Sequence, residues 1–272
     1  MLSRNNIIII GIALLTVTVI GGGLWAYDSV QGDTLAPSGP ITAIPLAANT
    51  VAPTLDAPGQ VSQPEPTEVR PTSGASATLE PTIAATSTTQ VSGPAIFQIS
   101  QDQSEVRFSI YEELAGEPRT VVGATSQVAG EVAVDLADLS KVQAGVIQIN
   151  ARTFVTDSER RNRAIRNFIL QTDQYEFITF TPKQIIGLSG SAQPGQLFTF
   201  QIAGDLTIRD ITQPVVFTVT VQGESAARLT GTATTVVKRS DYNLVIPSVP
   251  NVANVGEEVA LEIDFVAETA SN

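Results

Sequence analysis

Residues 95–272 repeatedly alternate apolar and polar side chains with a period of two, the pattern of β-strands that bury one face. In the last such segment, Glu262 and Asp264 alternate with Leu261, Ile263 and Phe265, so one face meets water and the other meets a core. The alternation marks residues 106–110, 132–136, 147–151, 198–202, 215–221 and 259–265. It predicts an all-β domain of antiparallel strands.

The segment 156–169 departs from this alternation. Thr156 and Glu159 have the spacing of a capping box, and Ile165, Phe168 and Ile169 recur at helical spacing. The segment therefore predicts one short helix. A single helix among many strands is typical of a barrel or a sandwich, and periodicity does not choose between them.

The N-terminal segment 7–26 is a run of 20 residues without a charge, long enough to cross a bilayer. Arg4 precedes it and Asp28 follows it, so the positive-inside rule places the N-terminus in the cytoplasm. Residues 1–27 are thus predicted to be a transmembrane signal anchor that leaves the rest extracytoplasmic. A cleaved signal peptide is the alternative, although Leu24-Trp25-Ala26 is a poor cleavage site.

Residues 28–94 carry 10 of the 16 prolines and no aromatic residue. Such a composition cannot bury enough apolar surface to offset the entropy cost of ordering. We expect a disordered linker that contributes nothing to the fold of the domain at 95–272.

Composition excludes several functions. The chain has no His and no Cys, which removes the usual metal ligands and catalytic bases, and no nucleophile motif such as GxSxG is present. A net charge of −12 argues against nucleic acid as a partner. We expect no enzymatic activity, no cofactor and no metal, and the sequence does not predict the oligomeric state.

The segment Gly204-Asp205-Leu206-Thr207-Ile208-Arg209-Asp210-Ile211-Thr212-Gln213-Pro214-Val215 resembles a strand-turn-strand motif of the YceI family. Further similar pieces lie on either side of this segment in the family's order, including Tyr175 to Phe180 and Arg239-Ser240-Asp241-Tyr242. The resemblance spans about residues 96–267. It implies an extended eight-stranded antiparallel, lipocalin-like barrel from a bacterial envelope, with a polyisoprenoid bound in its interior.

The inward positions of such a barrel are the candidate contacts of the lipid tail: Phe108, Ile149, Phe198, Phe200, Ile202, Ala203, Phe217, Val219 and Ile263. The helix would supply a flap, Ile165 and Phe168, over a mouth at that end. The alternative is that these side chains fill a solid core, because any barrel needs apolar alternation.

Arg161 and Arg166 on the helix are candidate contacts of a charged head group. Asp157 lies four residues before Arg161, so an ion pair on a solvated helix face is the alternative. The expected function is a membrane-tethered extracytoplasmic protein that sequesters or carries a polyisoprenoid or similar long amphiphile. A structural or protein-interaction envelope domain with a solid barrel is the competing interpretation.

Overall fold

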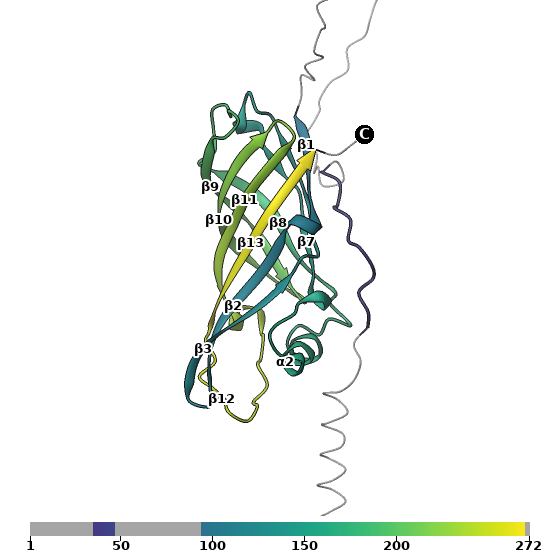
Figure 1. Ribbon diagram of the computed structural model, residues 1–272, viewed down its shortest axis with the longest axis vertical. Helices are drawn as coiled ribbons and strands as arrows, with labels where there is room; N and C mark the ends of the chain where they lie inside the picture. The colour runs from purple at the N-terminus through teal and green to yellow at the C-terminus, as the bar shows by residue number, and fades with distance from the viewer. Residues whose placement is uncertain (1–34, 47–93, 270–272) are drawn as a thin grey trace, which may run out of the picture. The chain divides into compact units, whose positions relative to one another are not determined.

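The computed structural model describes residues 35–46 and 94–269, and the second range forms an all-β domain (Figure 1). Each alternating segment contains a strand, because the period of two places its apolar residues on one face, although the predicted segments 132–136 and 147–151 run past the ends of β5 and β7. The strands are β1 Ala95–Ile99, β2 Glu105–Leu114, β3 Glu117–Thr125, β4 Val128–Ala129, β5 Glu131–Val134, β6 Gln143–Ala144, β7 Ile147–Asn150, β8 Phe177–Ile186, β9 Leu197–Ile208, β10 Ile211–Ser225, β11 Arg228–Lys238, β12 Val252–Ala253 and β13 Glu258–Thr269.

All of these strands belong to one curled antiparallel sheet, which favours the barrel over the sandwich. From β7 to β11 each strand pairs with the next, and β11 pairs with β13. The other side of β13 pairs with β2 and then β1, β2 pairs with β3, and β1 pairs with β5. The short ladders β4–β7 and β5–β6 lie at the two ends of this series. The arrangement is consistent with a lipocalin-like fold.

The core lies inside the curl, on the inward positions of the strands. On β10, for example, Phe217 and Val219 are 5% and 4% exposed, whereas the intervening Thr218 faces outward. One packed cluster gathers around Ile149, Phe154 and Tyr242 near the helix, and a smaller one around Phe97 at the opposite end of the sheet.

The predicted helix is present as α2, Glu159–Ala164, which continues as a π-helical turn over Ile165–Ile169. Its cap differs from the prediction, because Ser158 and not Thr156 accepts a hydrogen bond from the Arg161 amide. The Thr156 amide and hydroxyl instead both donate to Asn162 Oδ1 at 2.7 Å, which holds the approach to the helix.

Residues 35–46, the N-terminal strap, differ from the expectation of a linker without contacts. The Leu35 amide donates to Asp173, the Ser38 amide donates to Glu176, and the Leu46 amide donates to Glu131, each within 3.0 Å. Composition did not reveal this segment because the domain supplies the carboxylates that hold it. The rest of the predicted linker, 28–34 and 47–93, lies outside the described residues.

Within residues 35–46 and 94–269, no helix is long and apolar enough to cross a membrane. The anchor expected at 7–26 lies outside these ranges.

Candidate functional site

An apolar cavity occupies one half of the curled sheet, at the end where β1 begins and β13 ends. Counted out to where it meets solvent, its empty space is about 1160 Å³. Its lining comes from nearly every strand of the curl: Ile99, Gly130, Glu131, Val132, Val134, Leu136, Leu139, Val142, Ala144, Ile147, Phe180, Leu188, Ala192, Phe198, Phe200, Ile202, Phe217, Val219, Val221, Gly223, Leu229, Ala233, Ile263, Phe265 and Ala267.

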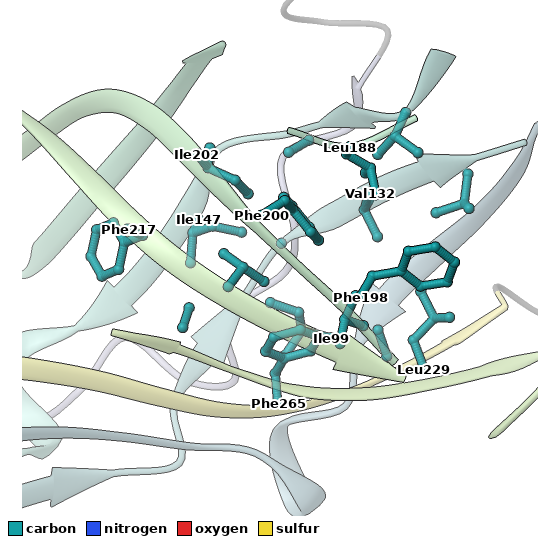
Figure 2. Close-up of a pocket in the computed structure, with 18 of the residues that line it drawn as sticks. Ile99, Val132, Ile147, Leu188, Phe198, Phe200, Ile202, Phe217, Leu229 and Phe265 are labelled. Atoms are coloured by element: carbon teal, nitrogen blue, oxygen red, sulfur yellow. The ribbon is translucent and has the colours of Figure 1, made fainter. Parts of the chain in front are cut away.

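The cavity has a loop end and a floor. At the loop end, segments 135–142 and 187–196 join by hydrogen bonds from the Leu139 amide to Gly190 O, 2.8 Å, and from the Ala192 amide to Leu136 O, 2.9 Å. Figure 2 shows Leu229 and Phe198 at one side of the lining and Phe217 at the other. Beyond Phe217 the inward positions no longer line the cavity, although they belong to the same packed cluster as the lining residues Phe180, Phe200, Phe217 and Val219. Leu206 and Ile208, nearer α2, are 2% and 5% exposed. The half nearer α2 is therefore filled.

Six of the nine predicted tail contacts line the cavity: Phe198, Phe200, Ile202, Phe217, Val219 and Ile263. Phe108 and Ile149 point inward but lie in the filled half, where Phe108 packs edge-to-face on Phe154 with ring centroids 5.4 Å apart. Period-two alternation gives the face of a side chain and not its height along the curl, so it did not separate these two from the others.

Ala203 does not line the cavity, because it lies on the outward face of β9. It shares that face with Gln201 and Asp205, whereas Ile202 points inward. The outward placement agrees with the ion pair between Asp205 and Lys183, 2.6 Å, across β8 and β9.

The predicted flap and head-group residues lie away from the cavity. Ile165 is 5% exposed within the packed cluster near α2, Phe168 is 38% exposed, and neither lines the cavity. Arg161 forms ion pairs with Glu112 of β2, 2.8 Å, and with Asp157, the partner that its spacing on the helix predicts. Arg166 is likewise not among the lining residues.

The site also contains residues that the sequence reasoning did not select. Phe265 and Val221 fall on the inward faces of alternating segments, so their signal was present in the pattern. Leu188 and Leu139 come from loops, where alternation gives no information. Phe180 belongs to the motif from Tyr175 to Phe180 that carried part of the family resemblance.

Two inward glycines show where aromatic rings fill space that a side chain would otherwise take. A Cβ at Gly204 would lie 2.7 Å from the Phe180 ring, and one at Gly231 would lie 2.8 Å from the Phe265 ring. Small residues in these strands therefore seat neighbouring rings and do not by themselves mark a void.

Glu131 is the one charged residue among those that line the cavity, and both of its carboxylate oxygens are occupied. Oε2 accepts from the Leu46 amide at 3.0 Å and Oε1 accepts from Gln98 Nε2 at 2.9 Å. Apart from this hydrogen-bonded carboxylate, which pairs with no Lys or Arg among the described residues, the interior offers hydrocarbon contacts. Among the described residues, no cluster of acidic side chains is arranged to hold a metal ion.

The nearest cations of the loop end are already paired. Lys141 forms ion pairs with Asp135 and Asp138, and Arg228 forms them with Glu224 and Glu268. A phosphorylated head group would therefore have to compete with these carboxylates for a partner.

Comparisons with known proteins identify a family and several similar structures. The sequence pattern of the YceI-like domain matches residues 97–267, while the search of curated proteins found no match. A solved polyisoprenoid binding domain from Saccharophagus degradans has a TM-score of 0.52 at 15% identity, covering 65% of this chain and 99% of its own. BcnA from Burkholderia cenocepacia has a TM-score of 0.48 at 21% identity, covering 62% and 98%. The YceI protein of Campylobacter jejuni has a TM-score of 0.44 at 15% identity, covering 55% and 85%.

The family match extends over more than half of the chain and includes every strand that lines the cavity. This chain belongs to the family of YceI-like domains.

Proposed function

We propose that this protein binds a long-chain apolar lipid, of the polyisoprenoid kind, by burying the tail in the cavity and performing no chemistry on it. The observation that carries the proposal is the cavity itself, which is lined almost entirely by aliphatic and aromatic side chains. The name of the Saccharophagus degradans domain describes polyisoprenoid binding, which supports the same class of ligand.

Hydrophobic transfer accounts for binding without a specific polar contact. A tail of four isoprene units would gain up to roughly 16 kcal/mol at about 0.8 kcal/mol per buried carbon. Association costs of about 4–15 kcal/mol oppose this gain. Tail burial is therefore large enough to drive binding, and a lining whose one charged residue is the acid Glu131 disfavours an anionic group inside.

The proposal includes the location of the domain and its attachment to a membrane. The segment 7–26 would anchor the chain in a membrane, so that the domain at 95–272 acts outside the cytoplasm near the lipids it binds. The competing function, a structural or protein-interaction domain, requires no occupant in the cavity.

Retention of a lipid through gel filtration tests the proposal. The purified full chain, loaded with radiolabelled geranylgeraniol, should retain close to one molecule per chain. Retention no higher than that of an unrelated protein of similar size and charge would overturn the proposal and favour the structural alternative.

A further inference from the structure

The floor of the cavity is a pair of phenylalanine rings, Phe180 from β8 and Phe217 from β10. The rings meet edge-to-face, with centroids 4.9 Å apart and planes at 65°, and both residues line the cavity. We propose that this pair sets the longest tail the cavity accepts, so that the site selects lipids by chain length. This inference rests on the proposed function and adds the selectivity of the same site.

Strand by strand, the lining stops at the level of these rings. On β9 the last lining residue is Ile202, and the next inward side chain, Leu206, is 2% exposed in the packed cluster. On β13 the last is Ile263, below which Leu261 packs against the same cluster. A tail that reaches the floor therefore meets packed side chains and not a continuing tunnel.

The position of Phe180 is fixed by the strand beside it. A Cβ at Gly204 would lie 2.7 Å from Phe180 Cζ and 2.4 Å from the carbonyl oxygen of Thr181. The ring thus rests directly on the β9 backbone and cannot retreat in that direction. The ring also contacts Phe217, so both the β9 backbone and a β10 side chain hold it.

The filled half contains a second pair of the same kind, which provides a matched control. Phe108 and Phe154 also meet edge-to-face, at 5.4 Å and 66°, but neither lines the cavity. Truncating a ring of this pair removes similar packing without altering the floor.

The volume limits where the cutoff falls. At roughly 30 Å³ per small group in a liquid, 1160 Å³ holds no more than about 40 carbons, or about eight isoprene units. Since this volume includes space open to solvent, the cutoff should lie at or below that length.

The test measures the affinity of the full chain for prenols of a few to about ten isoprene units, by competition with a bound fluorescent polyene. For the natural protein, affinity should rise roughly tenfold or more per unit up to a cutoff and by less than about twofold per unit beyond it. Phe217→Ala should move the cutoff about one unit longer, because it removes a ring from the floor. Val219→Phe, one inward position closer to the loop end, should move it about one unit shorter.

Phe108→Ala should leave the cutoff where it is in the natural protein. If Phe217→Ala does not fold, Val219→Phe alone decides the outcome. A cutoff that is absent, or one that is the same in the natural protein and in folded floor variants, would overturn the proposed role of the pair. Binding of no prenol of any length would instead refute the proposed function and this inference with it.

Discussion

Filling the cavity from β11 should weaken lipid binding at least a hundredfold while leaving the fold intact. Ala233 lines the cavity, where it pairs with Val219 on β10 and Ile263 on β13. Ala233→Phe adds a ring of about six carbons and takes the place of roughly four to six carbons of the tail. At about 0.8 kcal/mol each this costs about 3–5 kcal/mol of binding, or at least a hundredfold in affinity.

Stability separates a cavity from a solid core. A ring placed in empty space should change the free energy of unfolding by less than about 1 kcal/mol, whereas overpacking a filled core costs about 1–3 kcal/mol. Geranylgeraniol binding and urea unfolding of the full chain measure the two quantities. Ala203→Phe, on the outward face of β9, is the matched control and should retain full affinity.

Natural affinity of Ala233→Phe for lipid would show that the added ring does not occupy the tail's path, and would contradict binding in this cavity. Equal loss of affinity in Ala203→Phe would also refute it, because that side chain points away from the cavity.

Three further predictions concern stability. Burial alone would raise the pKa of Glu176, but hydrogen bonds from Ser38, Asn150 and Arg152 outweigh burial and hold this pKa below its ordinary value of 4.5. The ionised carboxylate therefore stabilises the fold above pH 4.5, and this stability is lost as the pH falls below that value, so Glu176→Gln should flatten the acid limb of a plot of unfolding free energy against pH. Burial, followed by the charge of the neighbouring Asp241, raises the pKa of Tyr242 to about 12, so the protein should lose stability as the pH rises from 10 to 12. Tyr242→Phe should abolish this loss, and an unchanged alkaline limb in this variant would contradict the raised pKa of Tyr242. Because Ile41 is 8% exposed, Ile41→Ser should lower the free energy of unfolding by about 1–3 kcal/mol and speed proteolysis within residues 35–46. An unchanged free energy of unfolding and an unchanged proteolysis rate would show that the N-terminal strap contributes no stability.

Local patterns predicted the elements and the faces of this fold. The alternation at 198–202 and 215–221 placed Phe200 and Phe217 inward, and helical spacing located α2. The face of a strand residue and the position of the helix both depend on residues only a few places apart in the chain, so the periodicity of the sequence predicts them.

Features that depend on distant residues were not predictable in the same way. Phe108 and Phe198 carry the same signal, yet one packs in the filled half and the other lines the cavity, because their heights depend on the register of the whole sheet. Arg161 pairs with Glu112, 49 residues away, and helix geometry alone gave no indication of this contact.

The N-terminal strap illustrates a further limit of composition. Four of its twelve residues are Leu or Ile, of which Ile41 is buried, and its amides bind carboxylates of the domain such as Glu176 and Glu131. The composition of one segment does not identify hydrogen-bond partners that lie more than 80 residues away in the chain, as Glu131 does from Leu46.

Photocrosslinking tests the central claim, that a lipid tail lies in the cavity, most directly. A prenol with a diazirine at the end of its tail would be bound to the full chain, irradiated, and its crosslinks mapped by mass spectrometry of peptides. The account predicts saturable crosslinks near the floor, at Phe180, Ile202 or Phe217, that excess unlabelled prenol suppresses. Crosslinks concentrated at α2, around Arg161 and Phe168, or scattered without saturation, would contradict it.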